Sequence, residues 1–88
     1  MYLLTYDIAN PKRLREVAKI CEKYLIRVQK SVFEGDLTEA QKYALWHDLE
    51  TLIDAKTDAI ALYYFPKVVI KKKTLLGIIP ADPYLIGV

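Results

Sequence analysis

The hydrophobic residues of the first 65 positions change their spacing in a fixed order, which few architectures can satisfy. Apolar residues are dense over 2–7, recur every three or four positions over 11–24 and alternate over 25–37; they regain helical spacing over 38–53 and are dense again over 58–65. These spacings predict a strand, a helix, two short strands or one kinked strand, a helix and a strand. This order is typical of the ferredoxin-like βαββαβ sandwich, an α+β fold in which two helices cover one face of an antiparallel sheet.

Local signals mark where both helices begin. Asn10 is a favoured N-cap, and Pro11 after it has a ring that presets the first helical turn. Thr38 and Gln41 have the spacing of a capping box. Helical spacing then predicts one buried stripe on each helix: Leu14, Val17, Ala18, Cys21 and Tyr24 on the first, and Leu45, Leu49, Leu52 and Ile53 on the second.

Size and composition predict one domain that associates with itself. Chains under about 100 residues rarely sustain two cores, and this chain has 88 residues. Strand 58–65 is apolar on both faces, so we expect it to be fully buried. Because two helices leave one sheet face bare, we expect a second copy to cover it, as a homodimer of cores 1–65. The apolar tail 66–88 is expected to add a strand associated with the dimer.

Cysteine use and hydropathy indicate the compartment. Cys21 is the single cysteine, which excludes an intramolecular disulfide and a cysteine-rich zinc site. No apolar run approaches the ~18 residues that cross a bilayer, and Asp7 interrupts the N-terminal apolar stretch before it could act as a signal peptide. We therefore expect a cytoplasmic protein with no membrane partner.

Charge is unevenly distributed, although the net charge is only +2. Residues 1–35 carry seven Lys and Arg against four Asp and Glu, residues 36–58 carry two against six, and residues 59–88 carry four against one. A chain polarised in this way can hold a polyanion on one surface, although charge blocks are as often solvated faces. The basic residues of the first helix could neutralise a nucleic-acid backbone: Lys12, Arg13, Arg15, Lys19 and Lys23.

Asp7 is the acid that the pattern singles out, because it ends an otherwise apolar strand. A carboxylate there needs a metal, a helix N-terminus or a basic partner, and from the residues alone a turn or helix cap is favoured. Arg27 and Ser31 share the strand parity of Phe33 and could bind a phosphate. They could equally be an exposed edge charge and a small sheet residue, and for Phe33 and Tyr6 packing is the favoured interpretation.

Three features together resemble the small CRISPR-associated endonucleases, the "Cas two" proteins. They are Tyr6-Asp7-Ile8 at the first strand end, the basic first helix, and Arg27-Val-Gln-Lys-Ser-Val-Phe-Glu-Gly35, which begins twenty residues after Asp7. The resemblance covers residues 1–65. It implies a ferredoxin-like homodimer with metal-dependent endonuclease activity on RNA or double-stranded DNA, which also bridges the integrase subunit during CRISPR spacer acquisition.

The resemblance also implies roles for single residues. Asp7 would hold one Mg²⁺, which two copies of Asp7 could share across the dimer axis, and Asp7, Arg27 and Ser31 would form the catalytic set. Tyr6 and Phe33 are second-rank candidates, and nucleic acid would be bound by Lys12, Arg13, Arg15, Lys19 and Arg27. Two alternatives stay open: a non-catalytic adaptor of the acquisition complex, and a toxin-like ribonuclease outside CRISPR.

Overall fold

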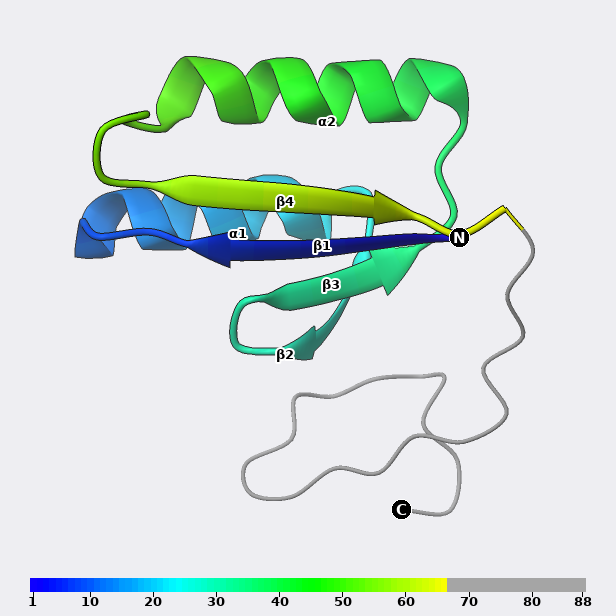
Figure 1. Ribbon diagram of the computed structural model, residues 1–88, viewed down its shortest axis with the longest axis horizontal. Coiled ribbons are helices and arrows are strands. Elements are labelled where there is room, and N and C mark those ends of the chain that lie inside the picture. Colours follow the sequence, from blue (N-terminus) through cyan, green and yellow to red (C-terminus); the bar gives the residue numbers. More distant parts are fainter. Residues whose placement is uncertain (67–88) are drawn as a thin grey trace.

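The computed structural model describes residues 1–66, which form a four-stranded antiparallel sheet and two helices (Figure 1). The elements run β1 (Tyr2–Asp7), α1 (Pro11–Glu22), β2 (Ile26–Gln29), β3 (Val32–Gly35), α2 (Glu39–Leu52) and β4 (Ala59–Tyr64). The predicted α+β class and βαββαβ order are confirmed, with two short strands between the helices. The described residues end at Pro66, so the strand predicted in tail 66–88 lies outside them.

The sheet has the strand order β2-β3-β1-β4, with every neighbouring pair antiparallel. β1 is central and pairs along its whole length with β4, from Tyr2 opposite Tyr64 to Asp7 opposite Ala59. In the described part of the chain β4 is therefore an edge strand. Within residues 1–66 of one chain it is not fully buried as expected, since Tyr63 and Tyr64 are 52% and 59% exposed, and its burial by a second copy stays a prediction. An edge strand keeps one side open, and the helices cover only one of its faces.

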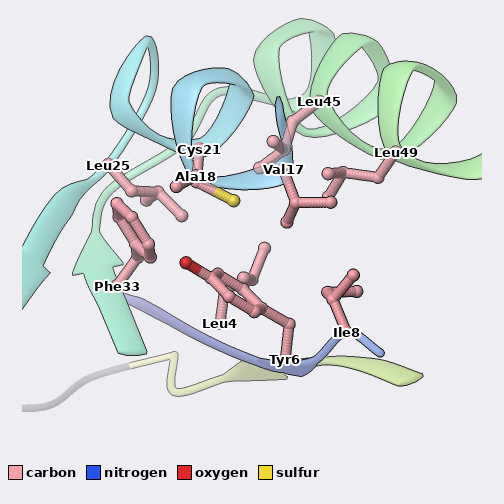
Figure 2. Close-up of a cluster of buried hydrophobic side chains, with 10 residues drawn as sticks. All are labelled: Leu4, Tyr6, Ile8, Val17, Ala18, Cys21, Leu25, Phe33, Leu45 and Leu49. Carbon is pink, nitrogen blue, oxygen red and sulfur yellow. The ribbon is translucent and has the colours of Figure 1, made fainter. Parts of the chain in front are cut away.

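Alternate side chains of β1 build the core (Figure 2). Leu4 and Tyr6 of the strand, and Ile8 just after it, point toward the two helices, as the period-two alternation of a strand requires. Phe33 of β3 packs with them and is 0% exposed, which confirms the core interpretation for its ring. The helices contribute the rest of the buried cluster, with Leu25 from the connection after α1: Val17, Ala18, Cys21, Leu25, Leu45 and Leu49.

Both predicted helix starts are confirmed. The Asn10 side chain accepts from Arg13 N at 3.0 Å, with Pro11 as the first helical residue. Thr38 Oγ1 accepts from Gln41 N at 3.1 Å while Gln41 Oε1 accepts from Thr38 N at 2.9 Å, which completes the capping box. Neither α1 nor α2 is long and apolar enough to cross a membrane, among the residues that the structure describes.

The predicted apolar stripes pack on the core, and Leu14 is the one stripe residue that is wrong. Leu14 is 39% exposed, because the first turn of α1 extends past the core. Tyr24 lies just beyond the end of α1, and like Leu52 and Ile53 around the end of α2 it is partly buried and packs against the core. Cys21 is fully buried, and this burial, with the negative charge of Glu22, raises the pKa of its thiol to about 12. The thiol is thus protonated and is no nucleophile at neutral pH.

Candidate active site and basic face

A pocket of about 380 Å³ lies at the carboxyl end of β1, bordered by the first turn of α1 and the β2–β3 hairpin. Its volume is in the range of small-ligand sites. Four of the residues singled out from the sequence meet there, together with an apolar wall and the hairpin lysine: Tyr6, Asp7, Ile8, Leu14, Arg27, Lys30 and Ser31 line the pocket. The fold therefore brings Asp7, Arg27 and Ser31 to one place, although the catalytic role of each stays a prediction.

Asp7 is the exposed acid of this pocket. It is the last residue of β1, and strand alternation places it on the sheet face opposite Tyr6. Asn10, and not Asp7, caps α1. Among residues 1–66 no hydrogen bond or ion pair engages the Asp7 carboxylate. The cap that the residues alone favoured for Asp7 is thus not what the structure shows, and the carboxylate is available to a ligand.

The carbonyl oxygen of Lys30 organises the polar side of the pocket. Tyr6 Oη donates to it at 3.0 Å, and Arg27 Nη2 and Nε donate to it at 2.7 and 3.2 Å. The Arg27 guanidinium lies 5.6 Å from the centre of the Phe33 ring, and its Nη1 is 3.5 Å from Glu22 Oε1. A guanidinium carries five N–H donors. These contacts therefore orient Arg27 and still leave N–H donors for a ligand.

Burial raises the pKa of Tyr6, more than the nearby charge of Arg27 lowers it. The phenol therefore keeps its proton at neutral pH and acts as a hydrogen-bond donor to the hairpin. Ser31 lies in the turn between β2 and β3 and not within a strand, and its carbonyl accepts from Tyr6 N at 3.1 Å. Tyr6 thus fixes the hairpin tip, which carries Lys30 and Ser31, against the end of β1.

The basic residues of α1 do not form one face. Lys12, Arg15 and Lys19 are all exposed, and their spacings of three and four residues place them one above another. Lys23, just past the helix, continues this basic stripe. Its far end borders a shallow groove of about 520 Å³ between the two helices, where Asp48 of α2 faces it.

Arg13 leaves the stripe, because one residue turns a helix by about 100°. Its Nε lies 2.8 Å from Asp58 Oδ2, and its Nη2 lies 3.4 Å from Asp58 Oδ1. The predicted nucleic-acid role of Arg13 stays a prediction, but the structure gives its guanidinium a protein partner.

Asp58 is the polar residue that the sequence analysis missed. Its side chain is 0% exposed, and its pKa is held well below the ordinary aspartate value, first by Arg13 and then by backbone N–H groups of Asp54 and Ala9. In the sequence it stands only as an acid before an apolar strand. No local pattern indicates a partner 45 positions away.

A metal would find few protein ligands in a single chain. No group of three or more His, Cys, Asp or Glu side chains gathers within residues 1–66. Mg²⁺ nevertheless keeps several of its waters and is commonly held by one or two carboxylates with substrate phosphates. Asp7 is exposed and unpaired, so it fits such a Mg²⁺ site as one of two carboxylates, the other being supplied by a second copy of the chain.

Comparison with known proteins gives consistent results. The family model described as CRISPR associated protein Cas2 matches residues 1–73. A CRISPR-associated endoribonuclease Cas2 of Thermodesulfovibrio yellowstonii is 41% identical over 76 residues, 86% of this chain and 85% of that protein. A CRISPR-associated endonuclease Cas2 of Halalkalibacterium halodurans is 41% identical over 68 residues, 72% of this chain and 71% of that protein. The crystal structure of Streptococcus pyogenes Cas2 at pH 6.5 superposes with a TM-score of 0.76 at 43% identity, covering 86% of this chain and 98% of that one.

Proposed function

The chain belongs to the Cas2 family of CRISPR-associated proteins, and from this membership we propose that it is a Mg²⁺-dependent endonuclease that works as a homodimer. Its substrate is RNA or double-stranded DNA. The names of relatives support a nuclease, since they include both endoribonuclease and endonuclease. The observation that carries the proposal is the pocket in which the unpaired Asp7 lies with Arg27 and Ser31.

Each side chain has a role that its surroundings support. Asp7 of each copy would hold the ion, which when bound polarises a phosphodiester and lowers the pKa of attacking water. Arg27, oriented by the Lys30 carbonyl, donates to the non-bridging phosphate oxygens. The Ser31 hydroxyl at the pocket wall donates to the same group. Tyr6 and Phe33 act indirectly, by holding the hairpin and the guanidinium.

Replacing Asp7 by Asn tests the assignment. Cleavage of a single-stranded RNA and of a DNA duplex is measured with Mg²⁺ and with EDTA. We expect Asp7→Asn to lower kcat by roughly a hundredfold or more on the substrate that the wild type cleaves, because the carboxylate charge that holds the ion is lost. Glu50→Gln on the exposed side of α2 is the matched control and should retain activity. Full activity of Asp7→Asn, or activity unaffected by EDTA, would refute the proposal.

The basic stripe favours a second candidate function, an adaptor that holds DNA and the integrase during spacer acquisition. Its members are exposed along α1 and can neutralise phosphates without reading sequence. We expect Lys12→Glu with Arg15→Glu to weaken duplex binding and to make the slope of log K against log salt shallower by about one unit per lost contact. Binding and slope equal to those of the wild type would exclude the stripe as the contact surface.

The endonuclease function and the adaptor function are compatible, and we propose that one cytoplasmic dimer carries out both. Family membership argues against the third candidate, a toxin-like ribonuclease outside CRISPR. The catalytic function and the adaptor function would be separated if the isolated wild type cleaves nucleic acid and Asp7→Asn loses this cleavage but binds DNA as the wild type does.

A further inference from the structure

The Asp58 carboxylate ties together three segments at the end of the sheet where Asp7 lies. Its Oδ1 accepts from Ala9 N at 3.0 Å, in the loop after β1. Its Oδ2 accepts from Asp54 N at 2.9 Å, in the turn before β4, and lies 2.8 Å from Arg13 Nε of α1. Thr57 Oγ1 donates to Oδ1 at 3.2 Å. A carboxylate has about four lone-pair sites, so these donors satisfy it fully inside the protein.

This cluster adjoins Asp7 from both sides. Ala59, the residue after Asp58, is the antiparallel partner of Asp7 in the sheet. Ala9, which the Asp58 side chain holds, comes two residues after Asp7. The backbone that carries Asp7 is thus fixed by strand pairing on one side and by the Asp58 carboxylate on the other.

We propose that Arg13 and Asp58 form a clasp that sets where Asp7 presents its carboxylate, so that both are positioning residues for the reaction at the pocket. The proposal rests on the proposed nuclease role of Asp7. Asp7 is exposed and has no partner in residues 1–66, so only its backbone can define its place. Misplacing a catalytic group by about 1 Å can cost a hundredfold in rate.

Stability alone does not account for these contacts. Apolar residues of similar volume often replace a buried ion pair at no loss of stability. Such residues could not accept the Ala9 and Asp54 N–H groups, which fix the two loops. The ion pair is thus suited to holding backbone in place, which is what a catalytic carboxylate at a strand end requires.

The clasp and a direct nucleic-acid role for Arg13 give opposite kinetic signatures. If Arg13 contacts phosphate, its loss raises KM and makes the salt slope of binding shallower by about one unit. If Arg13 acts through Asp58 and Ala9, its loss lowers kcat and leaves both KM and the salt slope unchanged. Asp58 is fully buried, so its replacement can affect catalysis only through the protein.

The experiment compares Asp58→Asn, Arg13→Ala and Arg13→Lys with wild type and with Glu50→Gln as the carboxylate-to-amide control. Two quantities are measured: kcat and KM for Mg²⁺-dependent cleavage, and hydrogen exchange of the Ala9 amide. In Asp58→Asn and Arg13→Ala we expect kcat to fall by roughly ten- to a hundredfold at constant KM. The Ala9 amide should exchange on the order of tenfold faster than in wild type, while the exchange rate of the Leu4 amide in β1 should be unchanged. Arg13→Lys keeps the positive charge. Its kcat should therefore fall less than that of Arg13→Ala, and its Ala9 amide should exchange less rapidly.

Because both residues act through one contact, the double variant should be no slower than the slower single variant. Wild-type kcat and Ala9 exchange in folded Asp58→Asn would overturn the clasp, as would a rise in KM with a shallower salt slope in Arg13→Ala. If Asp58→Asn does not fold, the same readouts in Arg13→Lys and Arg13→Ala decide. Full activity of Asp7→Asn would refute the nuclease proposal but not the clasp. The exchange rate of the Ala9 amide tests the contact between Arg13, Asp58 and Ala9 independently of catalysis.

Discussion

Asp7 and Asp58 lie at the same end of the sheet in opposite environments. The Asp7 carboxylate is exposed and has no partner within residues 1–66, whereas the Asp58 side chain is 0% exposed and accepts hydrogen bonds from four residues. Strand position explains the difference. Asp7 ends β1 on the sheet face that the helices leave open, while Asp58 precedes β4 where the turn folds back onto α1.

Acid should therefore destabilise the protein partly through Asp58. Its pKa is lowered in the folded state, first by Arg13, from about 3.9 in an unfolded chain. The stabilisation is thus fully present above about pH 5 and is lost as the pH falls through the unfolded and then the folded pKa. Urea titrations between pH 7 and pH 2.5 should show wild type more stable than Asp58→Asn at pH 7, with the gap shrinking below about pH 4.

Glu50→Gln serves as the control for this titration. Its carboxylate is exposed, so its curve should run parallel to that of the wild type. A gap between wild type and Asp58→Asn that stays constant from pH 7 to pH 2.5 would contradict the assignment of this acid sensitivity to Asp58.

At the scale of elements, the helix starts are specified by contacts within three residues. The α2 capping box joins Thr38 and Gln41 by two hydrogen bonds, of 3.1 and 2.9 Å. At the start of α1 a single hydrogen bond does this, in which Asn10 Oδ1 accepts from Arg13 N at 3.0 Å. Because both partners of each cap lie in one stretch of sequence, the caps could be predicted before the structure.

Replacing Thr38 by Ala should lower the free energy of unfolding by about 1 kcal/mol, since the amide of Gln41 loses its acceptor. Thr51→Ala is the matched control. Thr51 is exposed in the last turn of α2 and donates to Asp48 O. Its replacement should change stability by less than about 0.5 kcal/mol. Denaturant unfolding measures both, and equal effects of the two substitutions would remove the capping argument.

The open sheet face decides what the whole molecule can do. Figures 1 and 2 show α1 and α2 on one side of the sheet, so within residues 1–66 no helix covers the other face of β1 and β4. Leu3 and Tyr63 lie directly opposite each other there, on the face away from the core. This apolar pair on the uncovered face supports the proposal that a second copy packs there.

Tyr63→Lys should shift the protein from dimer toward monomer at micromolar concentration, because it buries a charge in the proposed interface. Tyr43→Lys is the control, since Tyr43 is 77% exposed on α2, away from that face. Sedimentation equilibrium gives the masses, and cleavage activity should fall with the dimer fraction if two copies of Asp7 share one ion. A monomeric wild type at micromolar concentration would remove the shared-ion mechanism.

What the sequence by itself determined about this protein is local. Periodicity predicted the order of elements, Asn10-Pro11 and the Thr38–Gln41 spacing predicted the two helix starts, and packing was the favoured interpretation for Phe33 and Tyr6. Each of these depends on groups that are neighbours along the chain, so the pattern is visible in the letters.

Tertiary structure alone decided the rest. The exposure of β4 follows from its place at a sheet edge, and that of Leu14 from where α1 begins relative to the core. The ion pair that takes Arg13 from the basic stripe joins residues 45 positions apart. Such contacts depend on how whole elements pack, and an arginine on a helix surface has the same local sequence whether it meets phosphate or a buried carboxylate.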